Sequence, residues 1–310
     1  MGVGIFDGLK YFFGGKAAKR AGPAFKKRAK RAVIDVAKRF EMKNQSGQGS
    51  MSKVWNAYDN KLGRMVCVKL LDKEKTKKFE ERFTSQGLSK PGEGEISTSL
   101  RHENCVQAYE HGLTPDGAPV LILEWVDGMG LNFLIETKSA QLNGNRVSLL
   151  IQLCKAIDYL HAQKYIHRDL CPRNIMVTKD GVIKLIDFGL TVPYTPDYTK
   201  PGNRTGTADY LAPEIIKRQS TDHRVDIFAL GVTAYEIFTG QMPWERAMTS
   251  EETLRRHLNV PPRSPKDINP DLDDDIAAIL SKAISREPAA RFATAGAMRE
   301  ALENLGRTDY

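Results

Sequence analysis

Hydrophobic and polar positions follow two different patterns in the two parts of this chain. From residue 40 to about residue 126, short apolar runs alternate with turns, most clearly at 66–71 and 119–126. Such runs predict β-strands. A single helix is expected between them, within residues 77–100. This part of the chain should therefore form mainly a β-sheet.

Beyond residue 127 the apolar positions recur at helical spacing. One stripe consists of Leu149, Leu150, Leu153, Ile157 and Leu160. Residues 225–238 are almost entirely apolar and predict a buried helix, and residues 272–305 predict two amphipathic helices. Lys179-Asp180-Gly181 lies between two short apolar runs and predicts a hairpin. The fold class is therefore α+β, with a small β-rich N-lobe and a larger helical C-lobe.

The net charge of +8 is concentrated at the N-terminus. Residues 1–40 contain eleven Lys and Arg against two Asp, which leaves the rest of the 310-residue chain close to neutral. The basic character therefore belongs to a leader, residues 1–39, and we expect no nucleic-acid partner.

Two interpretations of this leader stay open. Its apolar positions recur at helical spacing at Phe25, Ala29, Val33, Val36 and Phe40. A basic amphipathic helix would make peripheral contact with an anionic membrane or an acidic partner. Alternatively, the leader is a partly helical or disordered segment, solvated and packing one face on the folded domain.

Cysteine usage and hydropathy point to a cytoplasmic protein. The four cysteines show neither C-x-x-C spacing nor clustering with histidine, so a disulfide framework or a zinc site is not expected. No apolar run approaches the roughly 18–20 residues that span a bilayer. We therefore expect a cytoplasmic location, peripheral to a membrane if the leader binds one.

Two features of the first part of the chain suit an anionic ligand. Residues 47–54 are rich in glycine, which lets a backbone turn tightly and bring its N–H groups close to phosphate oxygens. A plain hairpin turn would have a similar sequence. Lys69 ends an apolar strand and needs an anionic partner if it is buried. Glu93, on the expected helix, could supply that carboxylate.

The strongest signal lies in the second part of the chain. It is the stretch His167-Arg168-Asp169-Leu170-Cys171-Pro172-Arg173-Asn174, followed by Asp187-Phe188-Gly189. Asp169 can accept a proton from an attacking hydroxyl, and Asn174 and Asp187 offer the hard oxygen ligands that magnesium prefers. A base for the nucleophile and a metal that bridges phosphates are what phosphoryl transfer requires.

With these residues the chain resembles the eukaryotic-type protein kinases over about residues 40–305. The resemblance implies a two-lobed kinase fold, with the N-lobe at 40–126, the C-lobe at 127–306, a short tail at 307–310, and ATP in the cleft between the lobes. It also implies ATP and Mg²⁺ as cofactors. The residues that it places around ATP are Gly47, Gln48, Gly49, Ser50, Ser52, Val54, Cys67, Lys69, Leu123, Glu124, Val126 and Met176.

The same resemblance implies the catalytic roles. It makes Asp169 the base, Asn174 and Asp187 the magnesium ligands, and Glu93 the partner of Lys69. Glu95 is the competing candidate for that last role. The segment Gly206-Thr207-Ala208-Asp209-Tyr210-Leu211-Ala212-Pro213-Glu214 is similar to the form of the Ser/Thr branch, with Thr207 in the catalytic set. Further positions that the resemblance fills are Arg291, expected to pair with Glu214, and Asp226, expected to anchor the catalytic loop.

Two features of the catalytic stretch leave alternatives open. Cys171 stands where Ser/Thr kinases usually have a lysine that steadies the phosphate, so either Arg173 takes over that contact or Cys171 lowers turnover. Arg168, beside the base, suggests control by a phosphate on the activation loop, with Thr205 and then Thr199 as candidate sites. The loop could instead order itself without modification.

The expected function is transfer of the γ-phosphate of Mg·ATP to serine and threonine hydroxyls of proteins. The compact activation segment resembles that of bacterial members of the family. A pseudokinase that acts as a nucleotide-binding scaffold is the alternative, but such proteins typically lack one of Lys69, Asp169, Asn174 and Asp187, all of which are present. The sequence does not determine the oligomeric state or the protein substrate.

Overall fold

The structure is a computed structural model that describes residues 32–48, 52–202 and 205–306. Its compact unit begins at Ala32, eight residues before the boundary expected at residue 40. The physical reason is that β1 (Ala32–Val33) pairs in parallel with β5 (Ala108–Leu113). Ile34, which follows β1, is only 3% exposed and packs in the core of the sheet. The last residues of the expected leader are therefore part of the domain.

The N-lobe is a six-stranded sheet in the order β1-β5-β6-β4-β3-β2. Its other strands are β2 (Phe40–Gln48), β3 (Ser52–Asp59), β4 (Arg64–Leu71) and β6 (Pro119–Glu124). All of the pairings except β1 with β5 are antiparallel. The strands expected at 66–71 and 119–126 are confirmed as β4 and β6, although β6 ends two residues earlier than expected.

The helical part of the N-lobe differs from the expectation of one helix within residues 77–100. Besides the short α1 (Val36–Arg39) there are two helices, α2 (Lys73–Thr84) and α3 (Glu93–Ser99). Gly87, in the left-handed region with φ 72°, and Pro91 lie in the break between α2 and α3. Both residue types interrupt helices, which explains the break.

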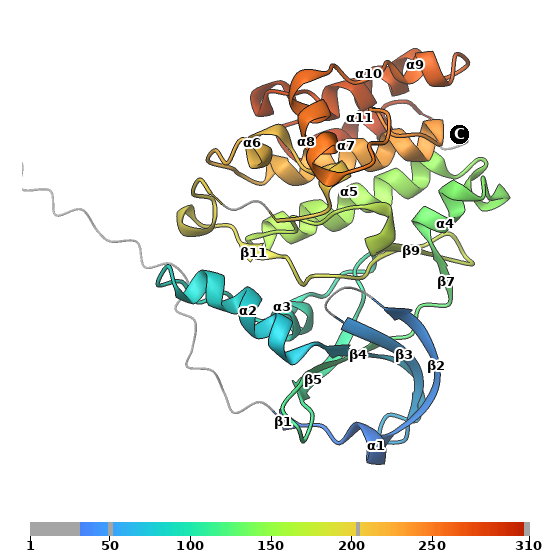
Figure 1. Cartoon of the computed structure of the whole chain (residues 1–310). Coiled ribbons are helices and arrows are strands. Elements are labelled where there is room, and N and C mark those ends of the chain that lie inside the picture. Colours follow the sequence, from blue (N-terminus) through green and yellow to red (C-terminus); the bar gives the residue numbers. More distant parts are fainter. Residues whose placement is uncertain (1–31, 49–51, 203–204, 307–310) are drawn as a thin grey trace, which may run out of the picture. The chain divides into compact units, whose positions relative to one another are not determined.

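The C-lobe is mainly helical, as expected. Its helices are α4 (Leu131–Glu136), α5 (Arg146–Ala162), α6 (Pro213–Ile216), α7 (Arg224–Thr239), α8 (Ser250–Asn259), α9 (Pro265–Ile268), α10 (Asp274–Ala283) and α11 (Ala295–Glu303). Its short strands are β7 (Gly128–Gly130), β8 (Tyr165–Ile166), β9 (Ile175–Thr178), β10 (Ile183–Leu185) and β11 (Val192–Pro193). Five 3₁₀ turns complete the described elements: η1 (Ala140–Leu142), η2 (Pro172–Asn174), η3 (Pro196–Tyr198), η4 (Ala208–Tyr210) and η5 (Pro288–Ala290). Figure 1 shows the sheet below and these helices above.

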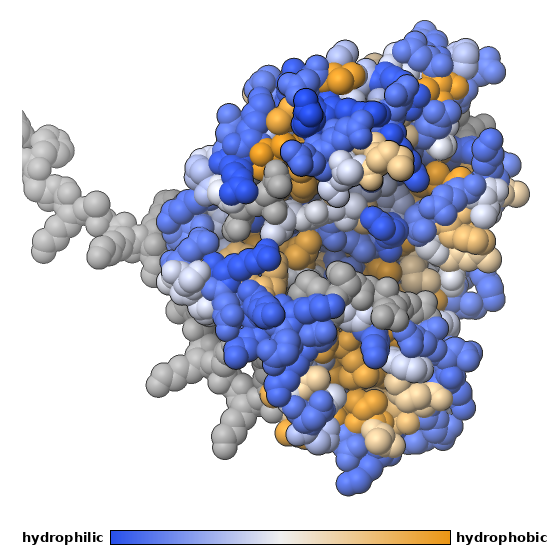
Figure 2. Space-filling view, in the orientation of Figure 1, coloured by the Kyte–Doolittle hydropathy of each residue, from blue (hydrophilic) through white to orange (hydrophobic). Residues whose placement is uncertain are grey.

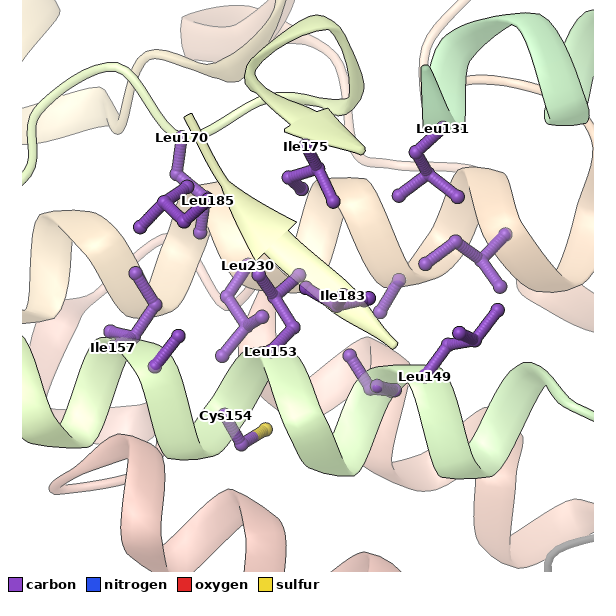
Figure 3. Packing of buried hydrophobic residues seen from close by; sticks show 14 of the residues in the cluster. Leu131, Leu149, Leu153, Cys154, Ile157, Leu170, Ile175, Ile183, Leu185 and Leu230 are labelled. Carbon is purple, nitrogen blue, oxygen red and sulfur yellow. The ribbon is translucent and has the colours of Figure 1, made fainter. Parts of the chain in front are cut away.

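The core of the C-lobe confirms the helical stripe read from the sequence. Leu149, Leu153 and Ile157 of α5 lie along one side of the helix and face Ile183 and Leu185 of β10 (Figure 3). All five side chains are at most 1% exposed. The expected hairpin is also confirmed, since β9 and β10 pair in antiparallel register around the turn at 179–182.

Helix α7 confirms the expected buried helix, and every residue from Val225 to Phe238 in it is buried.

The side of the molecule in Figure 2 is mostly hydrophilic, with smaller hydrophobic patches. Within the described residues, no helix has both the length and the apolar character that crossing a membrane requires.

Candidate active site

One buried carboxylate, on α7, holds the loop between β8 and η2 in place. Asp226 of α7 is 1% exposed and accepts hydrogen bonds from the backbone N–H groups of His167 (2.8 Å) and Arg168 (2.9 Å). Its Oδ2 atom also lies 2.8 Å from Nε2 of His161. Burial by itself would raise the pKa of Asp226, but the hydrogen bond with His161, together with the one from the N–H of Arg168, holds this pKa below its usual value. The loop therefore has a fixed, charged anchor within an apolar helix.

Asp169 is oriented from both sides. Its Oδ1 atom accepts two hydrogen bonds of 2.8 Å from Thr207, one from the backbone N–H and one from the hydroxyl. On the other side, Nδ2 of Asn174 donates to the backbone carbonyl of Asp169 at 2.8 Å and to Oδ2 at 3.1 Å. The structure thus brings together three of the residues that the sequence placed at the catalytic centre.

A buried lysine lies between two carboxylates on the N-lobe side of the site. Nζ of Lys69 is 2.6 Å from Oε1 of Glu93 and 3.0 Å from Oδ2 of Asp187. Burial alone would lower the pKa of Lys69, but the charges of Asp187 and Glu93 raise it above its usual value. Lys69 keeps its proton here, and its charge also helps to hold the pKa of Asp187 low despite burial.

The choice between Glu93 and Glu95 is decided by this contact. Glu95 instead accepts a hydrogen bond from the N–H of Gly92 at 2.9 Å, which caps α3. Gly94, between them, lets α3 lie close to β5, because a Cβ at this position would come within 2.6 Å of the side chain of His111. Gly94 lowers the intrinsic helix propensity of α3, but the close packing against His111 requires a glycine at this position.

The metal ligands implied by the sequence lie at one end of the β9–β10 hairpin. The backbone N–H of Ile186 donates to the carbonyl of Asn174 at 3.0 Å, and Asp187 is the next residue. Among the described residues, no three or more His, Cys, Asp or Glu side chains gather as a complete metal site. An amide and a carboxylate still fit magnesium, since this ion is commonly held by one or two protein oxygens together with substrate phosphates and water.

The residues expected around adenine lie on the strands and connection next to this site. Cys67 of β4 pairs in register with Leu123 of β6, and Met176 of β9 pairs with Gly130 of β7. Leu123 and Val126 are buried, at 4% and 7% exposure. Val126 and Leu123 belong to the main apolar cluster, against which Cys67 and Met176 pack.

Glu124 is fixed by its side chain rather than free in the cleft. Its Oε1 atom accepts hydrogen bonds from the backbone N–H of Gln107 and from Nζ of Lys184, both at 2.8 Å. Its backbone N–H also donates to the carbonyl of Gln107 at 2.8 Å. The sequence offered no signal for the contact with Lys184, which joins residues on different lobes.

The glycine-rich segment is described only in part. Gly47 and Gln48 end β2, where Gly47 pairs with Val54 of β3, and Ser52 begins β3. Gly49 and Ser50, which the sequence also placed near the phosphates, lie outside the described residues.

Cys171 and Arg173 differ sharply in exposure. Cys171 is 1% exposed, and burial raises the pKa of its thiol to about 11, so it carries no charge near neutral pH. Arg173 is exposed, and within the part of the chain that the structure describes its guanidinium has no hydrogen bond or ion pair. The positive charge of Arg173 is therefore exposed to solvent.

The pair expected between Glu214 and Arg291 is present and buried. The two guanidinium nitrogens Nη1 and Nη2 donate to Oε1 and Oε2 at 2.7 and 2.8 Å. The residues are 5% and 4% exposed. A two-point ion pair of this kind fixes the end of the segment that carries Thr207.

Arg168 has a partner that the sequence did not suggest. Its Nη2 atom donates to the backbone carbonyl of Tyr198 at 2.6 Å, and the residue is 7% exposed. Nothing in the local sequence around Tyr198 signals this contact, because a carbonyl group is present at every residue.

Comparison with known proteins agrees with this geometry. Residues 40–303 match the family model described as the protein kinase domain. A probable serine/threonine-protein kinase of Streptomyces coelicolor is 30% identical over 273 residues, which cover 86% of this chain and 39% of the relative. The serine/threonine-protein kinase PknB of Mycolicibacterium smegmatis is 32% identical over 275 residues, or 85% of this chain and 42% of the relative.

A third relative, the probable serine/threonine-protein kinase PknB of Corynebacterium glutamicum, is 32% identical over 284 residues, covering 88% of this chain and 43% of the relative. The chain therefore spans about two fifths of the length of the curated relatives that it matches. All three are bacterial, which agrees with the resemblance to bacterial members seen in the sequence.

Proposed function

The chain belongs to the protein kinase family, and from this premise we propose that it transfers the γ-phosphate of ATP to serine and threonine hydroxyls of proteins. The observation that carries the proposal is the convergence of Asp169, Asn174 and Asp187 opposite Lys69. These are the four groups that phosphoryl transfer requires, and hydrogen bonds or ion pairs orient them. This arrangement disfavours the pseudokinase alternative.

Each residue has a role that follows from its charge and neighbours. Asp169, held by Thr207 and Asn174, accepts the proton of the substrate hydroxyl as that oxygen attacks. Lys69 offers a permanent positive charge to the nucleotide phosphates, and Glu93 fixes its position. Magnesium, when bound by Asn174 and Asp187, would neutralise charge on those phosphates. The hydrogen bonds that Thr207 donates to the base Asp169, together with the names of the relatives, support serine and threonine as acceptors.

The test is transfer of labelled γ-phosphate from Mg·ATP to a generic protein substrate, followed by identification of the labelled residues. We expect phosphoserine and phosphothreonine, and no transfer when EDTA removes the metal. Absence of label on any polypeptide, the chain itself included, would contradict the proposal. Label on tyrosine alone would contradict the acceptor class.

Arg173 is expected to hold the transferring phosphate in place of the missing lysine. The double variant Cys171→Lys, Arg173→Ala should then keep a kcat within about threefold of the natural chain, whereas Arg173→Ala alone should lose about 10²-fold. Arg255→Ala, which removes an exposed arginine of α8, is the control. A double variant that keeps the Tm of the natural chain but is inactive would show that Arg173 does not replace that lysine.

For the leader we propose peripheral contact with an anionic membrane. Residues 1–31 contain nine Lys and Arg against one Asp, and each such charge near an anionic surface contributes about 1 kcal/mol. The deletion that tests this must stop at residue 31, because Ala32 to Arg39 belong to the folded unit. The full chain should sediment with phosphatidylserine vesicles at low salt and the shortened chain should not. Equal sedimentation of both forms, or of neither, would refute membrane contact.

A further inference from the structure

Helix α2 belongs to the N-lobe by sequence but contributes to an apolar cluster of the C-lobe. Phe83, in its last turn, is 3% exposed and packs in the cluster that contains Val192, Tyr198 and Leu211. Phe79, one turn earlier, packs against the same cluster. Figure 1 shows α2 and α3 on the side of the sheet that faces the C-lobe. One buried side chain of a helix that none of the proposed catalytic roles requires thus packs against the segment that carries Thr207.

The contact that joins the two lobes here is aromatic. The ring of Phe83 lies 5.8 Å from that of Tyr198 in η3, measured between centroids, and 5.5 Å from that of Phe79 in an edge-on arrangement. Tyr198 is 6% exposed, and its carbonyl accepts the hydrogen bond from Arg168. Phe83 therefore packs on the residue whose backbone carbonyl accepts a hydrogen bond from the arginine next to the catalytic base.

This arrangement gives Arg168 a partner that carries no phosphate. Its guanidinium is buried against a peptide carbonyl, although the sequence had suggested a phosphorylated threonine. The hydroxyl of Thr199, one candidate, already donates to the carbonyls of Thr195 and Pro196 at 3.2 and 3.3 Å. The backbone N–H of Thr207 meanwhile reaches Asp169.

A second contact joins the residues after α2 to the metal-binding end of the site. Lys90 is 5% exposed, and its Nζ atom donates to the carbonyl of Gly189 at 3.2 Å. The N–H of Gly189 in turn donates to Oδ1 of Asp187 at 2.8 Å. Lys90 also lies over the ring of Phe79, 5.5 Å from its centroid. The last turn of α2, through Phe83, and the end of the segment that follows it, through Lys90, therefore contact residues next to the catalytic groups.

We propose that residues 73–90 form a positioning element, through Phe83 and Lys90, that holds the activation segment and Gly189 in the catalytic arrangement without any phosphate on the segment. Phe83 fixes Tyr198, whose backbone carbonyl is the partner of Arg168. Lys90 fixes the carbonyl of Gly189, two residues after Asp187. The inference rests on the proposed kinase function, because positioning matters to the rate only if Asp169 and Asp187 serve phosphoryl transfer.

The test uses the full chain, treated with phosphatase and shown by intact mass to carry no phosphate. We compare the natural chain with Phe83→Ala, Lys90→Met and the control Phe133→Ala, which removes the same ring from a position that is 50% exposed on α4. Phe83→Ala and Lys90→Met should lower kcat about 10- to 100-fold with KM for ATP changed less than threefold, since a misplaced group slows the reaction. Phe133→Ala should match the natural chain.

Hydrogen exchange provides a readout that does not depend on activity. Backbone amides at 191–202 should exchange faster in Phe83→Ala, while those of α5 and α7 stay as protected as in the natural chain. Should Phe83→Ala fail to fold, Phe83→Leu, which keeps the bulk and removes the ring, and Lys90→Met decide the question.

Two results would overturn the inference. One is a dephosphorylated natural chain that is inactive but becomes active when the activation segment is phosphorylated. The other is a folded Phe83 variant with the kcat and exchange rates of the natural chain. If no form of the natural chain transfers phosphate, the proposed function fails, and the exchange rates still show whether Phe83 orders the segment.

Discussion

Asp169→Asn is expected to lower kcat by about 10²–10⁴-fold, the range that a positioned general base contributes. Asparagine has nearly the same shape as aspartate but cannot take the proton of the substrate hydroxyl. Its side-chain oxygen can still accept the hydrogen bonds that Thr207 now donates to Oδ1. Its NH₂ group, however, would face Nδ2 of Asn174, which donates to Oδ2 in the natural chain. The loss of the base and of this contact should act together on the rate.

The measurement is the steady-state rate of labelled phosphate transfer, with ATP affinity measured separately. The affinity should stay within about threefold, because Asp169 has no contact with Lys69 or Glu93 among the described interactions. Asp180→Asn is the matched control, since Asp180 is exposed in the turn of the β9–β10 hairpin. Transfer by Asp169→Asn at the rate of the Asp180→Asn variant would exclude Asp169 as the base.

Arg291→Met is expected to destabilise the domain by about 3–5 kcal/mol, because it leaves the carboxylate of Glu214 buried without its partner. Arg291 also donates to the carbonyls of Ser285, Arg224 and Arg286, at 2.8, 3.0 and 3.0 Å. Those acceptors would lose their donors as well. For a domain of this size the loss corresponds to a fall in Tm of roughly 10 °C.

Thermal and denaturant unfolding of the purified variants checks this expectation. Arg246→Met is the control, since Arg246 is 74% exposed and lies 3.7 Å from Glu236, a pair for which about 0–1 kcal/mol is expected. Changing Glu214 to Gln in the Arg291→Met background should recover part of the loss, because it removes the buried charge. Equal Tm values for Arg291→Met and Arg246→Met would show that the buried pair does not stabilise the domain.

The sequence alone indicated the proposed chemistry and the division into two lobes. Asp169 and Asn174 lie five residues apart in one loop, so their spacing already restricts their geometry. The apolar stripe of α5 and the apolar run of α7 also identify themselves, because a helix repeats its buried side at a fixed interval. These features depend on residues that are near one another in the chain.

Only the tertiary structure decided the features that depend on distant residues. It placed the start of the domain at Ala32 through pairing with β5, and it paired Lys69 with Glu93 rather than Glu95. It also showed that Arg168 meets the carbonyl of Tyr198, which Phe83 covers. A sequence records which side chains can make such contacts, but segments far apart in the chain meet only where the packing of the whole domain brings them together.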